Sequence, residues 1–250
     1  MIVEEILKSL KDQLSTHVVE EIRIGFHYTG VLLDDSGLGL AYSLKNESLE
    51  CCTTFKQAGT LKGPAWNLAA LAMSPRSLEA SIGVATINAL VNRDIIGEEG
   101  DLLEFLELEG TEKIAIVGNI RPIVRKLKQA GHEVLVFERR PQEPEVHPDW
   151  AAEYLLPTAD ITIITGVAFI NKTIDHLLDL SKNARTIAII GPSTPLAADI
   201  LREHKVTLLG GVTVEDAEKA LRIISQAGGT QELKAATRKV TMNLLEFKGR

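Results

Sequence analysis

The second half of the chain alternates short apolar runs with segments of helical periodicity, and this pattern restricts the fold more than any other feature. From Lys113 onward, five near-continuous apolar runs follow one another: KIAIVG, EVLVFE, ADITIITG, ARTIAIIG and VTLLGG. Three prolines predict a loop over 141–148, between the second and third runs. Strands that are apolar on both faces and alternate with helices are typical of a parallel sheet covered on both sides. The sequence therefore predicts an α/β fold with a Rossmann-like C-terminal domain, followed by a last helix over about residues 232–246 that could pack on either domain.

The first half has a different pattern. It opens with an apolar stripe at helical spacing over residues 3–14, followed by one long strand, VEEIRIGFHYTGVLL. Turn residues at 34–37 and the returning run LGLAYSL predict a hairpin, and two helices follow at about 66–73 and 78–91. This order indicates a smaller α+β domain. We place the domain boundary in the acidic, glycine-containing segment near residue 110, which divides the chain into 1–109 and 110–250.

The charge, the apolar segments and the cysteines of the chain disfavour several kinds of binding partner and location. The net charge of -7, without a basic run, disfavours nucleic acid as a ligand. No segment has the roughly 20 apolar residues of a membrane span, and acidic residues near the N-terminus disfavour a signal peptide. The only cysteines, Cys51 and Cys52, are adjacent, so they cannot form a disulfide framework. We therefore expect a cytoplasmic protein.

The first two strands of the predicted sheet end in polar residues. Gly118 and Asn119 follow the first strand, but the three-glycine dinucleotide fingerprint is missing there, so a simple strand-to-helix turn is an equally good interpretation. Glu138 ends the second strand, where an acid commonly binds ribose hydroxyls. The alternative is a solvated carboxylate paired with Arg139 or Arg140.

The third strand ends at Thr165 and Gly166, and Asn171 and Thr173 follow before the next helix. Helix capping explains one of the two later polar residues. It does not explain the glycine, which would let the backbone approach a ligand closely. We therefore treat all four residues as candidate ligand-binding residues.

The fourth strand is followed by Gly191, Pro192, Ser193 and Thr194, and Pro195 would suit the first turn of a helix. Two hydroxyls beside free N–H groups at a helix N-terminus would form a cradle for a carboxylate or phosphate. Capping accounts for only one of the two hydroxyls. This segment is the strongest single candidate site in the sequence.

Other candidates carry less weight. After the fifth strand, Thr213 and Asp216 have the spacing of a capping box. His27 could reach a ligand if its strand face meets the second domain, although a half-exposed edge strand explains it equally well. The histidines and cysteines have no metal-ligand spacing. Cys51 and Cys52 could still bind a soft metal, but buried thiols are the commoner case.

Several segments together resemble one known family. They are IGFHYTGVLL, AGTLKG, VGNIRP, VFERRP, ITGVAFINKTIDHLL and IIGPSTPL. The chain resembles the putative heavy-metal chelation family, whose members pair an enolase N-terminal-like domain with a Rossmann-like domain. The resemblance implies a site between the two domains that chelates heavy metals or handles a chelator. By position it points to Thr165, Gly166, Asn171, Thr173, Gly191, Pro192 and Ser193, with Gly118 and Glu138 nearby. Enolase chemistry does not transfer, since this chain lacks the barrel that carries it.

The favoured function is the binding of a small anionic metabolite or a metal–chelator complex in the cleft between the domains. One alternative is a transferase that uses S-adenosylmethionine, with Glu138 on the ribose. Another is direct metal binding by Cys51 and Cys52. The sequence leaves open whether the protein binds or catalyses, indicates no particular cofactor, and is compatible with a homo-oligomer.

Overall fold

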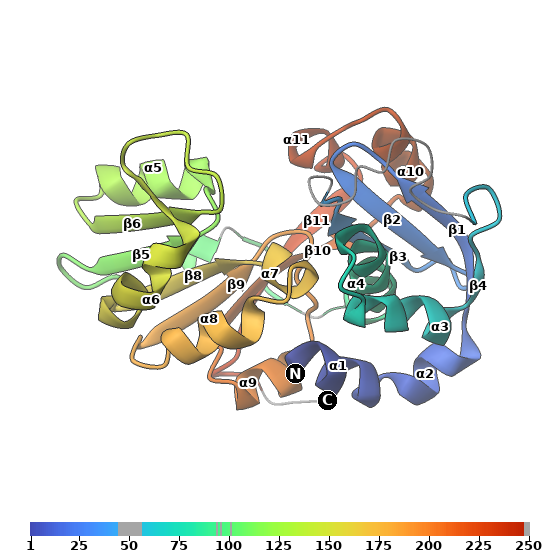
Figure 1. Cartoon of the computed structure of the whole chain (residues 1–250), viewed down its shortest axis with the longest axis horizontal. Helices are drawn as coiled ribbons and strands as arrows, with labels where there is room; N and C mark the ends of the chain where they lie inside the picture. The colour runs from blue at the N-terminus through green and yellow to red at the C-terminus, as the bar shows by residue number, and fades with distance from the viewer. Residues whose placement is uncertain (45–56, 94, 96, 101, 248–250) are drawn as a thin grey trace.

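The computed structural model describes residues 1–44, 57–93, 95, 97–100 and 102–247. Its described strands form two sheets, which occupy opposite sides of Figure 1. The smaller sheet is antiparallel and has the order β3-β2-β1-β4. The larger has the order β11-β10-β9-β8-β5-β6-β7 and is parallel except for β11. The expected mixed α/β architecture, with one large and one small sheet, is confirmed.

The five strands expected in the larger sheet are all present. They are β5 (Lys113–Val117), β6 (Glu133–Glu138), β8 (Ile161–Thr165), β9 (Thr186–Ile190) and β10 (Leu208–Val214). Taken in chain order, these strands lie side by side as 2-1-3-4-5. The chain therefore reverses its direction of winding between β5 and β8, and in such sheets that reversal creates a crevice beyond the carboxyl ends of the strands.

Helices connect these strands, and short turns of helix fill the remaining connections. The α-helices are α5 (Arg121–Gln129), α6 (Ala152–Leu155), α7 (Val167–Ile170), α8 (Ile174–Leu180), α9 (Ala198–Glu203), α10 (Ala217–Ser225) and α11 (Thr230–Leu233). The 3₁₀ turns are η2 (Leu102–Glu104), η3 (Asp149–Ala151) and η4 (Leu156–Thr158). In the part of the chain that is described, no helix is both long enough and apolar enough to cross a membrane.

Three sequence-based expectations for this half were wrong. The expected loop at 141–148 contains a short strand, β7 (Val146–Pro148), that pairs with β6 and ends at a proline on the sheet edge. The expected C-terminal helix is a strand, β11 (Thr237–Asn243), because antiparallel pairing along the whole of β10 overrides the local helical pattern. Asp216 is the N-cap of α10 and accepts a hydrogen bond from the Lys219 amide, so it does not hold the third helical position of a capping box.

The N-terminal half contains the smaller sheet and the helices that flank it. Its strands are β1 (Val18–Ile24), β2 (Tyr28–Leu33), β3 (Leu38–Tyr42) and β4 (Gly63–Pro64). Its helices are α1 (Ile2–Ser9), α2 (Lys11–Thr16), α3 (Ala65–Ala69), the 3₁₀ turn η1 (Ala70–Met73) and α4 (Ser77–Val91). The predicted hairpin is present as β2 and β3, with its turn at residues 34–37.

The single long strand expected over 19–33 is two antiparallel strands, β1 and β2, so this prediction was wrong. The chain turns at residues 25–27. A Cβ on Gly25 would lie 2.3 Å from the carbonyl oxygen of Ile224 at the end of α10. The strand is therefore interrupted where a second element packs directly against its backbone.

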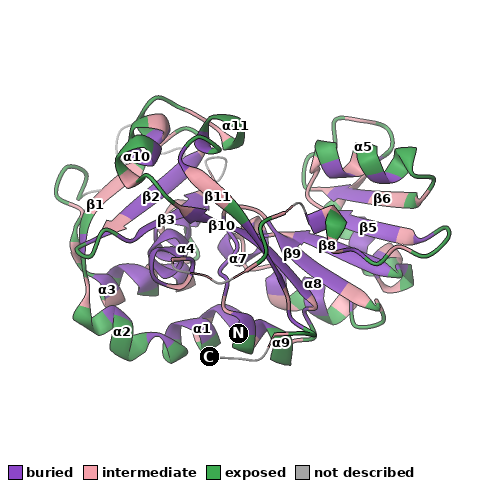
Figure 2. Ribbon diagram, turned by 180° about the vertical axis from the view of Figure 1, so that it is seen from behind, coloured by how far each residue is buried: buried purple, intermediate pink, exposed green. Residues whose placement is uncertain are grey.

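Helix α4 lies at the centre of the molecule and is buried on nearly every side, as its colour in Figure 2 shows. It packs against β2, β3, α3, η1 and α7. Two glycines permit these contacts: a Cβ on Gly39 would lie 2.0 Å from the Ala85 carbonyl oxygen, and one on Gly83 would lie 1.8 Å from the Ala72 nitrogen. Backbone thus meets backbone on two faces of this helix.

The C-terminal segment also packs on the smaller sheet. Leu221 and Ile224 of α10 and Leu233 of α11 form one apolar cluster with Tyr28 and Leu40 of the hairpin. Residues from the two ends of the chain therefore share one core. The boundary near residue 110 stays a prediction. Helices α10 and α11 follow it in the sequence but pack on the N-terminal half.

Hydrogen bonds at the C-terminal end of α4 join the N-terminal half to the segment after β9. Asn92 is buried at the C-terminal end of α4, where its Nδ2 donates to the Thr194 carbonyl oxygen at 2.9 Å. The Leu196 amide donates to its Oδ1, also at 2.9 Å. Nearby, the Tyr42 amide donates to the Ser193 hydroxyl at 2.8 Å. The segment after β9 is thus fastened to the N-terminal half by a set of buried hydrogen bonds.

We expect the Asn92→Ala substitution to lower the free energy of unfolding by about 2 kcal/mol or more, because it leaves a buried amide and a buried carbonyl without partners. Chemical denaturation measures this change. The control is Asn183→Ala, which removes a long 3.5 Å hydrogen bond at an exposed position and should change the stability by less than about 0.5 kcal/mol. Equal effects of the two substitutions would contradict the interpretation.

Candidate functional site

A cavity of about 670 Å³ lies where the order of the larger sheet reverses. It opens beyond the carboxyl ends of β5, β6 and β8, and the N-terminal half contributes Tyr42 and Leu44 to its wall. It therefore lies between the two halves of the molecule, at the position where doubly wound sheets bind their ligands. Six of the predicted site residues line it: Gly118, Asn119, Glu138, Thr165, Asn171 and Thr173.

The turn after β5 is held by the end of β6. The Glu138 carboxylate accepts a hydrogen bond from the Asn119 amide at 2.8 Å, so one of its oxygens is bound to the backbone. Gly118 has φ of +96° and lies against Thr165, whose Cβ would be 3.0 Å from an added Cβ. One carboxylate oxygen therefore stabilises a turn that requires glycine.

The segment between α7 and α8 forms a second wall. The Asn171 side-chain oxygen accepts hydrogen bonds from the Thr173 hydroxyl at 2.7 Å and from the Thr173 amide at 3.2 Å. This arrangement, in which the asparagine side chain bonds to the backbone two residues later, fixes both side chains at the cavity edge. Their polar groups are thus held in place at the cavity wall before any ligand binds.

The structure adds lining residues that were not among the sequence-based candidates. Arg139 and Arg140 follow β6, Trp150 follows β7, and His176 of α8 bonds to Glu153 at 2.5 Å. The strand-end rule could have indicated the two arginines, since they directly follow Glu138. Trp150 could be indicated only if β7 had been predicted. The prolines in that segment predicted a loop instead.

The segment after β9 has a different environment from the one expected. Ser193 and Thr194 are 2% and 0% exposed and do not line the cavity. Helix α9 begins at Ala198, four residues after Thr194, so these hydroxyls do not cap it. Gly191 and Pro192 also lie outside the cavity lining. As described above, this segment joins the two halves of the molecule.

Gly166 is required for that junction. A Cβ at this position would lie 2.6 Å from both the amide nitrogen and the hydroxyl of Thr194. The backbone that approaches this glycine is therefore the segment after β9, and Gly166 itself is not among the cavity-lining residues. The sequence suggested that this glycine lets a ligand come close to the backbone. In the structure it lets the Thr194 backbone come close instead.

His27 lies at the β1–β2 turn, away from the cavity lining. Its ring stacks edge-on against Phe26 at 4.8 Å and faces Gly229. It therefore contacts the C-terminal segment that covers the smaller sheet. Cys51 and Cys52, the candidate soft-metal ligands, fall outside the described residues.

Lys172 is the most unusual ionisable group near the cavity. Its ammonium donates to the carbonyl oxygens of Ala72, Phe169 and Ile170, and thus connects α7 with η1 of the other half. Burial lowers the pKa of Lys172 to about 8. The three carbonyl acceptors oppose this effect, because they favour the charged amine.

A large, mostly parallel sheet and a smaller antiparallel sheet, with a cavity where the strand order of the larger one reverses, define a two-domain α/β fold. Residues 101–243 match the model of a family described as putative heavy-metal chelation, and residues 7–91 match a second model with the same description. The chain belongs to this family, and the resemblance noted in the sequence is confirmed.

Relatives share the fold over almost their whole length. An uncharacterised protein of Methanocaldococcus jannaschii is 30% identical over 264 residues, covering 98% of each chain. A crystal structure of a protein of unknown function from Pyrococcus horikoshii superimposes with a TM-score of 0.86 at 28% identity, covering 97% of this chain and 100% of that one. A second, from Desulfitobacterium hafniense, has a TM-score of 0.83 at 28% identity and covers 96% and 98%.

The environment of Lys172 predicts a particular pH dependence. Its pKa of about 8 in the folded chain lies below the value of about 10.4 in an unfolded chain. Between these values the unfolded chain binds more protons, so raising the pH through this window favours the folded state. We expect the melting temperature of the wild type, relative to the Lys172→Met variant, to rise from pH 8 to about pH 10.

Differential scanning calorimetry at several pH values measures this difference. The matched control is Lys182→Met, at an exposed position. Its difference from the wild type should stay constant over the same range. A Lys172 difference that shrinks with pH would contradict the burial of the amine.

Proposed function

We propose that the cavity binds a small anionic molecule, most readily as a complex with a metal ion. Support comes from its place at the reversal of the sheet and from the arginines after β6. Arg140 is exposed at the cavity wall, which is where a carboxylate-bearing ligand would meet it. The polar residues Asn119, Thr165 and Thr173, which also line the cavity, would orient the ligand.

Trp150 supports a ligand with a flat or apolar part. It is 66% exposed although it lines the cavity, and it packs edge-on against Tyr154 at 6.5 Å. Large exposed aromatic side chains at a cavity mouth commonly provide contact area for a ligand. An anionic chelator carries both kinds of surface, acidic groups and a carbon framework.

The metal would enter the cavity with its chelator and not as a bare ion. Within the described residues, the cavity does not bring together three histidine, cysteine or carboxylate donors at metal-binding separations. The acids that line the cavity are instead engaged: Glu138 with a backbone amide, Glu153 with His176, and Asp149 with Arg139 and the Trp150 amide. The ion would therefore take its ligands mainly from the bound molecule.

The transferase alternative gains no support from the relatives. It required Glu138 to bind a ribose, but one oxygen of this carboxylate already holds the turn after β5.

The proposal is tested by isothermal titration with the Ni²⁺–citrate complex, with citrate alone as a second titrant. We expect the complex to bind the wild type and to bind Arg140→Gln at least about tenfold more weakly, since a hydrogen bond to a charged group contributes about 1.5–3 kcal/mol. Citrate alone should show the same loss.

Arg222→Gln is the matched control, because this arginine lies on α10, away from the cavity, and pairs with an exposed glutamate. Its affinity for the complex should equal that of the wild type. If neither titrant binds the wild type, or if both arginine variants lose the same affinity, the proposed cavity function is wrong.

A further inference from the structure

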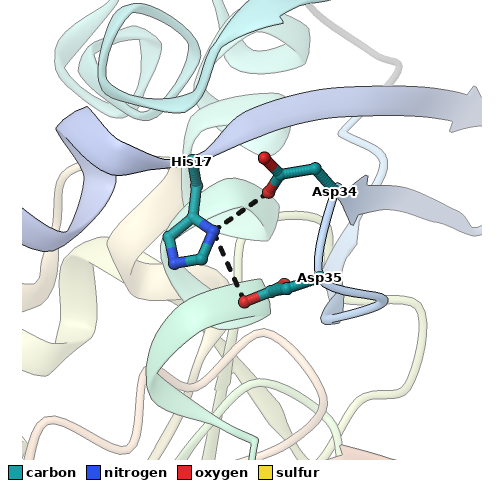
Figure 3. Close-up of side chains that lie close together, drawn as sticks. All are labelled: His17, Asp34 and Asp35. Carbon is teal, nitrogen blue, oxygen red and sulfur yellow. Dashed lines mark hydrogen bonds and ion pairs between the residues drawn. The ribbon is translucent and has the colours of Figure 1, made fainter.

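A second cluster of metal-ligating side chains lies on the N-terminal half. His17 precedes β1, and Asp34 and Asp35 begin the turn between β2 and β3. Figure 3 shows the three side chains pointing toward one another. It is the one group of three such donors, among the residues described, whose ligand atoms all lie within 4.8 Å of each other.

The backbone around the cluster is well defined. The Asp34 amide donates to the Val18 carbonyl oxygen at 2.9 Å, which ties the turn to the start of β1 beside His17. The Gly37 amide donates to one oxygen of Asp35 at 3.2 Å, so this side chain is oriented by its own turn. The two carboxylates are thus directed to one side of the turn, toward the imidazole.

The distances suit a shared cation. The His17 Nδ1 atom lies 3.0 Å from Asp34 Oδ1 and 3.4 Å from Asp35 Oδ2. Donors bound to one ion at about 2.0–2.2 Å, as in zinc sites, are themselves about 3 to 3.5 Å apart. The imidazole nitrogen therefore lies as far from each carboxylate oxygen as two donors of a shared ion do, and all three ligand atoms lie within 4.8 Å of one another.

The local charge also favours a cation. Two carboxylates face one guanidinium, that of Arg93, which contacts Asp35. The two acids therefore outnumber the one arginine that contacts them. Their side chains are 37% and 29% exposed, which leaves room for water on the remaining coordination positions.

We propose that His17, Asp34 and Asp35 form a binding site for a divalent transition-metal ion of borderline softness, such as Zn²⁺, Co²⁺ or Ni²⁺. One imidazole and two carboxylates suit this class of ion better than a soft ion that prefers thiolates. Three protein ligands leave the other positions open to water or to an exogenous ligand.

This site is separate from the interdomain cavity. The turn that carries Asp35 lies just before the first residue of β3. Tyr42, which lines the cavity, is the last residue of the same strand. Five extended residues span about 16 Å. The proposal therefore does not depend on the function proposed for the cavity, and either can fail without the other.

The test is titration of chelator-treated, full-length protein with Co²⁺, followed by calorimetry and visible absorption. We expect one equivalent to bind the wild type, with at least about tenfold loss of affinity in His17→Ala and in the nearly isosteric Asp34→Asn. Arg93→Gln should strengthen binding, because the guanidinium competes with the ion for Asp35. A purely structural ion pair would show no such gain.

Two control variants make the outcome decisive. His204→Ala removes a comparable pair, in which His204 lies 2.6 Å from a Glu5 oxygen at another surface, and it should bind Co²⁺ like the wild type. Cys51→Ser tests the thiols. The proposal is overturned if the wild type binds no Co²⁺, if folded Asp34→Asn binds it undiminished, or if Cys51→Ser alone abolishes binding.

Discussion

The burial of helix α4 on nearly every side is the constraint on which the rest of the structure depends. An apolar helix of 15 residues cannot be covered by the small antiparallel sheet alone, because a sheet covers only one side of a helix. Helix α7 of the larger half supplies another side. The two halves are therefore held together by a shared core, and the cavity between them has walls that are fixed relative to each other.

Two of the segments that resemble the family contribute to this arrangement in different ways. ITGVAFINKTIDHLL passes along the cavity, with Thr165, Asn171 and Thr173 on its wall. IIGPSTPL instead contacts the N-terminal half, where Ser193 accepts a hydrogen bond from the Tyr42 amide. Tyr42 itself lines the cavity. The buried segment thus positions a wall of the site without being part of it.

The large sheet and much of the cavity could be predicted from the sequence because they follow from local rules. Continuous apolar runs define parallel strands, and polar residues at their ends, such as Asn119 and Thr165, collect at one edge. Features that depend on distant pairing could not be predicted. Strand β11 has a helical pattern that only its pairing with β10 overrides. The His17 cluster joins residues whose spacing along the chain has no metal-binding signature.

The buried residues Ser193 and Thr194 show a further limit. Hydroxyls before a helix indicate a cap or an anion site equally well, and the sequence does not reveal that the helix starts later, at Ala198. Burial against another part of the chain is a tertiary property, and nothing in the local pattern distinguishes it from exposure to a ligand.

The packing of α10 and α11 on the hairpin has a consequence for the order of folding during synthesis. Tyr28 and Leu40 are synthesised nearly 200 residues before their apolar partners Leu221 and Leu233. Domains generally fold as units as the chain emerges. Here the antiparallel hairpin must wait with an uncovered face until α10 and α11 have been synthesised.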